Sequence, residues 1–187
     1  MSIISNSSIT FFALLAFFTN SLLAEDVPNP QYQSWNNYPV GTSMTTKSLV
    51  SQGNATVTTT TVTRLISRTE KNLVLSSVVS SNATGSFVTN DPIEKTISSR
   101  FPLFPGVDKN KIGRPQDSLE SGMETVVSLG KKYNAEWYDT KSTTEAGPAV
   151  TRTWISMDMP NMVLKAVTEV KVAGKKVIIE VTEIKIP

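Results

Sequence analysis

The sequence contains no cysteine and no histidine among its 187 residues. Without histidine there is no Ser-His-Asp triad and no imidazole ligand for a metal ion. Without cysteine, thiol catalysis, zinc-thiolate sites and disulfides are excluded. Gly106 and Gly113 match no nucleotide-binding fingerprint, because neither stands in a Gly-rich phosphate loop. We therefore expect no enzyme, no cofactor and no metal site.

Charge is also sparse and balanced. The chain has eighteen basic and sixteen acidic residues, which gives a net charge of +2. Lysines and glutamates alternate rather than cluster, and no basic face with interleaved aromatic residues is present. The sequence therefore gives no support for nucleic-acid binding.

A short apolar run stands near the start of the chain. Residues Ile9 to Phe18 are rich in phenylalanine and leucine, and Ala24 precedes the first acidic pair, Glu25-Asp26. A run of this length fits the centre of a secretory signal better than a membrane span. The alternative is a buried or membrane-anchoring helix. We predict a signal peptide over residues 1–24, no stable membrane span after its removal, and a periplasmic or secreted location.

Removal of that leader leaves 163 residues, the size of one domain. Residues 25–41, with three prolines, predict an extended lead-in pinned by Trp35 and Tyr38. Residues 42–187 predict a single β domain, because β-branched residues and period-two alternation dominate. A Pro-rich segment at 101–116 predicts a long crossing between two halves of one sheet. Asp117 to Glu124 could hold one helical turn.

The expected strands are separated by turn residues and fill the β domain. Their ranges are 42–50, 55–66, 73–81, 86–98, 123–129, 133–143, 150–156, 162–172 and 176–186. Val177, Ile179 and Val181 share one face of the last strand, whereas Ile184 falls out of phase. A β-bulge near Thr182 would explain this change of phase. Alternatively, both faces of the strand are covered there. The predicted fold is all-β: a strongly curved antiparallel sheet, half-barrel or up-and-down open barrel, with eight or nine strands.

Aromatic residues are the candidate ligand-binding groups. A single sheet of this size must cover its apolar face or curl around it, and a gap in the curl would bind an apolar ligand. We predict that Trp137, Trp154, Phe101 and Phe104 line such a cup. The alternative is ordinary core packing. The expected protein is a monomeric, non-enzymatic binding or structural module whose partner is a lipid or another envelope component.

Two other chemistries stay open. A carboxylate-dependent hydrolase of envelope glycans or esters needs two acids that converge in a cleft. A Cu(I) protein could use three thioethers in a span of six residues, Met157, Met159 and Met162, because sulfur suits this soft ion. The candidate acids are Glu120, Glu124, Glu136, Asp139 and Asp158.

Several short motifs carry a resemblance. They are Trp35-Asn36-Asn37-Tyr38-Pro39-Val40-Gly41, Gly130-Lys131-Lys132, Trp137-Tyr138-Asp139 and Thr153-Trp154-Ile155-Ser156 followed by Pro160. Together they resemble uncharacterised secreted bacterial β-rich proteins, which are distantly similar to the half-barrel sheets of periplasmic lipoprotein carriers. The resemblance implies an incomplete barrel that cups acyl chains, with a helix plugging the cup. It supplies no catalytic residues.

Overall fold

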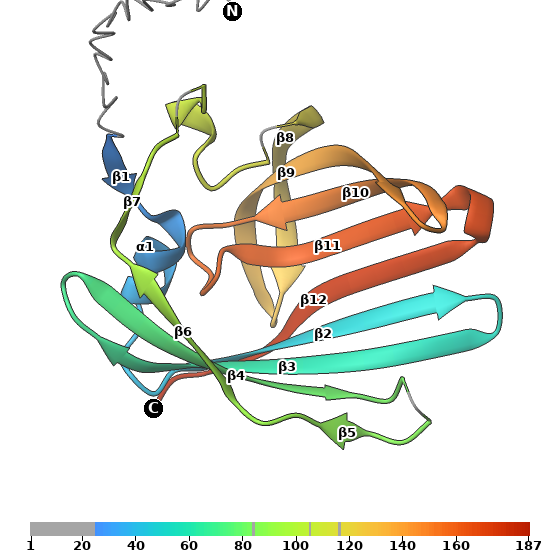
Figure 1. Cartoon of the computed structure of the whole chain (residues 1–187), viewed down its shortest axis with the longest axis horizontal. Helices are drawn as coiled ribbons and strands as arrows, with labels where there is room; N and C mark the ends of the chain where they lie inside the picture. Colours follow the sequence, from blue (N-terminus) through green and yellow to red (C-terminus); the bar gives the residue numbers. More distant parts are fainter. Residues whose placement is uncertain (1–24, 84, 105, 116) are drawn as a thin grey trace, which may run out of the picture.

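The computed structural model describes residues 25–83, 85–104, 106–115 and 117–187. The predicted leader at 1–24 lies outside the described residues. The main element is a ten-stranded antiparallel sheet that curls strongly without closing (Figure 1). The predicted all-β, half-barrel class is therefore confirmed. Within the described residues, no helix has the length and apolar character needed to cross a membrane.

The sheet consists of two antiparallel meanders joined at its centre. One holds β2 (Ser43–Gln52), β3 (Ala55–Arg68), β4 (Asn72–Ser81), β5 (Val88–Thr89) and β6 (Ile93–Ser98). The other holds β8 (Ser118–Ser128), β9 (Lys131–Thr144), β10 (Gly147–Ile155), β11 (Val163–Val170) and β12 (Lys175–Lys185). The meanders meet because β2 pairs with β12. The expected up-and-down order thus holds within each half, and the predicted strand at 86–98 is two short strands.

The segment between the meanders connects β6, at one edge of the sheet, to β8, at the opposite edge. It contains β7 (Arg100–Pro102) and the 3-10 turn η1 (Lys109–Lys111). β7 pairs with β1 (Asp26–Pro28) in a separate two-stranded sheet. Asp117 to Glu124 forms no helical turn, because from Ser118 onward this segment is the start of β8.

Threonine and serine side chains pair across neighbouring strands. Oγ1 of Thr63 lies 3.0 Å from Oγ of Ser77, and Oγ1 of Thr151 lies 2.8 Å from Oγ1 of Thr168. Such pairs satisfy hydroxyl groups on a half-buried surface while the β-branched side chains suit the pleat. The threonine-rich composition therefore serves sheet formation directly.

The predicted bulge in the last strand is present. In the β12–β2 ladder the register shifts between Val181 and Glu183, which leaves Thr182 without an opposite residue. Val181 is then paired with Thr46 and Ile184 with Met44, residues two apart on β2. Because alternate residues of a strand share a face, the bulge brings Ile184 to the same face as Val181. Both side chains contribute to the buried cluster.

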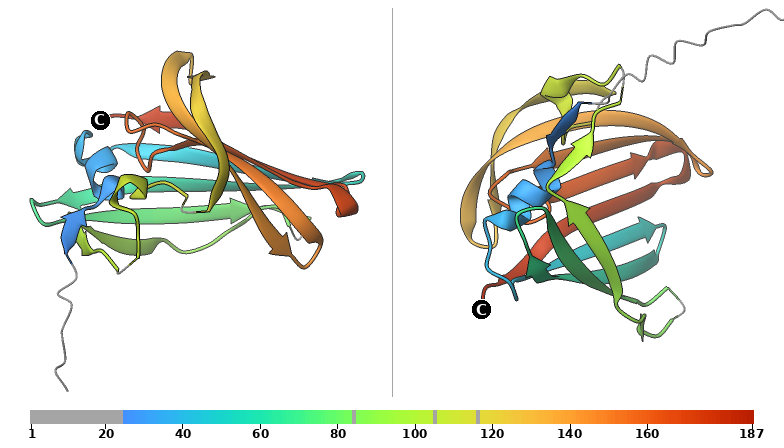
Figure 2. Two further views of the ribbon diagram at one scale, coloured as in Figure 1. Left: turned by 90° about the horizontal axis from the view of Figure 1, so that it is seen from above. Right: turned by 60° about the vertical axis from the view of Figure 1, so that its left-hand side comes forward.

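The lead-in is not extended throughout, and here the prediction was wrong. Residues Pro30–Asn36 form the helix α1, whose N-cap Asn29 accepts a hydrogen bond from the backbone N–H of Gln31 at 3.0 Å. Asn at the N-cap followed by Pro at the first helical position is a strong start signal for a helix. α1 lies inside the curl of the sheet (Figure 2).

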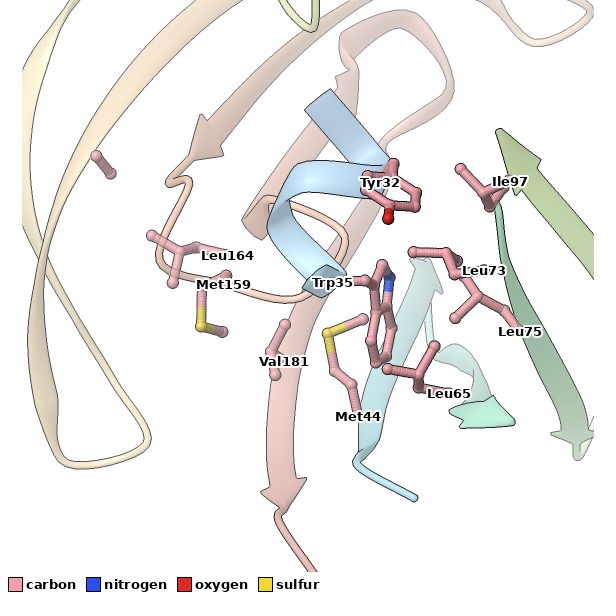
Figure 3. Packing of buried hydrophobic residues seen from close by; sticks show 11 residues of the cluster. Tyr32, Trp35, Met44, Leu65, Leu73, Leu75, Ile97, Met159, Leu164 and Val181 are labelled. Atoms are coloured by element: carbon pink, nitrogen blue, oxygen red, sulfur yellow. The ribbon is translucent and has the colours of Figure 1, made fainter. Parts of the chain in front are cut away.

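Trp35 anchors α1 to the concave face and is fully buried, as its predicted pinning role requires. Its indole packs near Met44, Leu65, Leu73 and Leu75 (Figure 3). α1 therefore plugs one part of the cup.

Candidate functional site

A pocket of about 580 Å³ lies beside α1. Four parts of the chain form its walls: α1, the crossing segment, the β8–β9 pair and the loop between β10 and β11. Its volume is in the range of small-molecule sites. The lining residues are Pro30, Gln33, Lys109, Asn110, Ile112, Gly113, Arg114, Met123, Asn134, Glu136, Ile155, Ser156, Met157, Asp158 and Met162.

Three methionines from two parts of the chain share this pocket. Met123 comes from β8, and Met157 and Met162 come from the β10–β11 loop. Met123 is 67% exposed and Met157 is 44% exposed. Exposed methionines are typical of adaptable apolar binding surfaces, because the thioether chain is flexible and polarisable.

The β10–β11 loop turns Met162 toward the pocket through an uncommon backbone conformation. Asn161 and Met162 have φ values of 61° and 66°. This left-handed region is tolerated by asparagine but costs a bulky residue energy. The loop is held by the hydrogen bond from Met162 N–H to the carbonyl of Met159 (3.0 Å) and by Gln31 Nε2, which donates to Oδ1 of Asn161 (2.6 Å). The surrounding contacts thus stabilise a strained conformation at the pocket wall.

The opposite wall carries an ion pair. Arg114 Nε and Nη2 donate to the two carboxylate oxygens of Glu136 at 2.7 Å and 2.6 Å. The hydroxyl of Tyr138 also donates to Glu136. The pKa of Glu136 is lowered, chiefly by the hydrogen bond from Arg114, although burial opposes this. Burial, followed by the hydrogen bond to Glu136, raises the pKa of Tyr138 to about 12. Glu136 is therefore held as a carboxylate and Tyr138 as a phenol.

The crossing segment packs tightly against α1 next to this ion pair. A Cβ on Gly113 would lie 2.9 Å from Cγ of Pro30, so only glycine fits here without a shift. Gly113 also has a φ of 77°, which favours glycine. The crossing segment is thus fixed at two adjacent residues. Gly113 packs against Pro30 of α1, and Arg114 pairs with Glu136 of β9.

Trp137 and Trp154 lie outside the pocket. They are direct cross-strand partners on β9 and β10. Their sequence neighbours Glu136 and Ile155 line the pocket, and alternate residues point to opposite faces, so both indoles are on the other face. There the guanidinium of Arg152 stands 4.2 Å from the Trp137 ring centre, and Trp154 Nε1 donates to Glu124 at 3.0 Å. Trp154 is also partly buried against the core, so the pair serves packing and ionic contacts rather than the pocket.

Phe101 and Phe104 are also separate from the pocket lining. Phe101 is half-buried and pairs with Val27 in the β1–β7 sheet. Phe104 follows β7 and is 69% exposed. The four aromatic residues predicted to bind a ligand are therefore not brought together. Ligand binding by any of them stays a prediction.

The candidate copper ligands separate in the fold. Met157 and Met162 line the pocket, but Met159 is fully buried near Leu164 in the core (Figure 3). The third methionine of the pocket is Met123, which sequence spacing could not identify. Among the described residues, no group of three or more acidic side chains is arranged for a metal ion.

Two of the candidate acids share the pocket and three do not. Glu136 and Asp158 line it. Glu120 pairs in register with Asp139 away from the pocket, and Asp139 accepts two hydrogen bonds from Arg152 at 2.7 Å and 2.6 Å. That contact lowers the pKa of Asp139. Because Glu136 is held ionised, it is a poor proton donor at neutral pH.

Comparisons with known proteins give fold likeness only. No family model and no curated protein matches the chain. A Bacteroides fragilis protein with a YmcC-like fold, provisionally described as exported, is 9% identical, with a TM-score of 0.46 over 79% of this chain and 97% of that one. A Parabacteroides distasonis protein provisionally described as a lipoprotein is 10% identical, with a TM-score of 0.43 over 79% and 96%. The hypothetical protein CT021 of Chlamydia trachomatis is 11% identical, with a TM-score of 0.38 over 86% and 93%.

These neighbours are bacterial proteins of the kind that the sequence motifs resemble. With TM-scores below 0.5, they transfer no function to this chain.

Proposed function

We propose that the protein is an exported, non-enzymatic binding module that holds a small amphipathic, lipid-like molecule in the pocket between α1 and the crossing segment. The observation that supports this most is the convergence of Met123, Met157 and Met162 on one pocket of about 580 Å³. The methionines and Ile155 would contact an apolar body, and the polar wall at Arg114 and Lys109 would contact a polar head.

Glu136 is poorly suited to be the proton donor of a hydrolase. A carboxylate pair that cleaves a glycoside or ester needs one acid that can give up a proton. Glu136 has a lowered pKa and already accepts hydrogen bonds from Arg114 and Tyr138. Its role is to fix Arg114 and the crossing segment at the pocket wall.

The test uses the mature chain and the fluorescent fatty acid 11-dansylundecanoic acid. We expect saturable binding with a blue-shifted emission. Met123→Lys and Met157→Lys should each weaken binding about tenfold or more, because an ammonium group in the apolar part would have to be desolvated. Leu119→Lys is the matched control: Leu119 stands on the same strand, is 54% exposed and is not part of the pocket lining.

Equal affinity of the Met123, Met157 and Leu119 variants would reject this pocket as the binding site. Two results together would reject the function itself. The chain would show no saturable binding of the probe, and native mass spectrometry of protein purified from its host would give the mass of the polypeptide alone, without a bound molecule.

A further inference from the structure

The turn between β8 and β9 exposes a leucine where the backbone favours asparagine or glycine. β8 ends at Ser128 and β9 begins at Lys131, so Leu129 and Gly130 form a two-residue hairpin loop. Their φ values are 52° and 72°. Positive φ at both positions is the signature of a type I′ turn, for which Asn-Gly is the preferred sequence. A leucine at the first position is therefore unfavourable for the turn itself, which points to a role for its side chain.

Leu129 borders a groove at the end of the sheet. The groove has a volume of about 320 Å³, and its lining includes Tyr38, Tyr133, Ile184 and Ile186. A second groove of about 390 Å³ shares Leu129 and Thr182 with the first. The two grooves therefore adjoin, and their walls mix apolar side chains with charged ones: Lys131 and Glu183 in the first, Lys165 and Glu180 in the second.

Several apolar side chains around this groove are exposed. Leu129 is 37% exposed and Ile186 is 60% exposed. Val40, 46% exposed, precedes Gly41, where an added Cβ would lie 3.4 Å from Cγ of Pro187, so Val40 is near the end of β12. Tyr38 and Tyr133 add amphipathic rings to the same groove. Exposed apolar surface of this kind marks an interaction site when it is contiguous.

The surrounding charge is positive. Lys131 and Lys132 follow the turn directly, and Lys185 lies on β12. Lys185 pairs with Glu183 at 3.2 Å. In the part of the chain that the structure describes, neither Lys131 nor Lys132 has a carboxylate partner. Around the two grooves, four lysines (Lys131, Lys132, Lys165 and Lys185) therefore accompany two glutamates, Glu180 and Glu183.

We propose that this end docks on an anionic lipid surface. The docking surface comprises Val40, Leu129, Lys131, Lys132 and Ile186. Leu129 and Ile186 enter the headgroup region, the two lysines bind lipid phosphates, and Tyr38 and Tyr133 lie at the interface. Combined apolar and cationic contacts are what peripheral membrane binding requires, since either alone is weak. This inference uses a different surface from the pocket and does not depend on the proposed function.

Leu129→Asn provides a sharp test, because asparagine suits the left-handed conformation while removing the apolar side chain. Flotation would be measured with vesicles of phosphatidylcholine containing phosphatidylglycerol, and with phosphatidylcholine alone. We expect binding to the anionic vesicles only, reduced about fivefold or more by Leu129→Asn and by the double change Lys131→Glu with Lys132→Glu. Higher salt should weaken it.

Two controls separate docking from general stickiness. Phe104→Asn removes a side chain that is 69% exposed elsewhere, and Lys171→Glu changes a surface lysine on η2 (Lys171–Ala173). Both should bind as the unmodified chain does. Unchanged binding by Leu129→Asn, or equal binding to neutral vesicles, would overturn the proposal. Full competition by glycerol phosphate would also overturn it, because it would indicate a site for free phosphate rather than a lipid surface.

Discussion

Trp137 lies directly against Gly122, its cross-strand partner on β8. A Cβ on Gly122 would come within 2.8 Å of Nε1 and 2.9 Å of Cε2 of the indole. The ring is therefore held between the bare backbone of β8 and the guanidinium of Arg152. Aromatic cover of a glycine on a neighbouring strand is a recognised device of β-sheets.

Gly122→Ala should therefore destabilise the protein by about 1–3 kcal/mol, since the added methyl group overpacks this contact. Urea unfolding monitored by tryptophan fluorescence measures the loss. In the double variant Gly122→Ala with Trp137→Leu, the alanine should cost much less than in the single variant. Strict additivity of the two changes would contradict direct contact.

Glu136→Gln should loosen the crossing segment. Arg114 and Glu136 have side chains that are 41% and 34% exposed, so we expect a cost of only about 1 kcal/mol. Hydrogen exchange should become faster around residues 109–114. The pKa of Glu136 is lowered in the fold, so its stabilising effect is present above its ordinary value of 4.5 and is lost as the pH falls through the folded pKa. The stability difference between the two proteins should therefore shrink at acidic pH, and a constant difference would contradict the ion pair.

Tyr138 gives an independent measurement of the same cluster. One of the four tyrosines should ionise near pH 12 in a spectrophotometric titration. Its stabilising effect is present below the ordinary pKa of 10.0 and is lost between pH 10.0 and about 12. Glu136→Gln should lower this pKa, because it removes a negative charge next to the hydroxyl, while burial keeps the pKa above its ordinary value.

Ile184 and Ile186 should differ sharply in their contribution to stability. Ile184 packs against the buried cluster because of the bulge at Thr182, whereas Ile186 is 60% exposed. Ile184→Ala should cost about 2–3 kcal/mol. Ile186→Ala should stay within about 0.5 kcal/mol. Thermal and urea unfolding of the two variants would compare them, and equal losses would contradict the bulge.

Leu129→Asn should raise stability. Leucine in the left-handed region costs about 1–2 kcal/mol more than a residue that tolerates it. We expect a gain of about 1 kcal/mol and a higher Tm by calorimetry. Asn161→Gly is a useful comparison: asparagine already suits its φ of 61°, and the change removes the hydrogen bond from Gln31, so it should lower stability by about 1 kcal/mol rather than raise it.

The strands were predictable because their signals are local. Period-two alternation and turn residues placed β2, β3, β4, β9, β10, β11 and β12 correctly, and the phase change at Ile184 located the bulge. α1 was missed because seven residues give too short a window for helical periodicity, although Asn29-Pro30 is a start signal.

The site was less accessible to sequence reasoning. Met123 and Arg114 reach the pocket through the curl of the sheet and the path of the crossing segment, neither of which is encoded locally. Period-two alternation along β9 places the side chains of Trp137 and Glu136 on opposite faces of the sheet. It does not say which of the two faces is concave, because both faces carry aromatic residues.

The pairing of β2 with β12 also governs how the chain can fold. Ser43 lies opposite Lys185, so the central ladder joins residues from the two extremes of the β domain. Contacts so distant in sequence make folding slow, because a very long loop must close first. A nascent chain would hold two separate meanders until β12 has left the ribosome. The central ladder, and with it the curl of the sheet, would therefore form only once β12 has been synthesised.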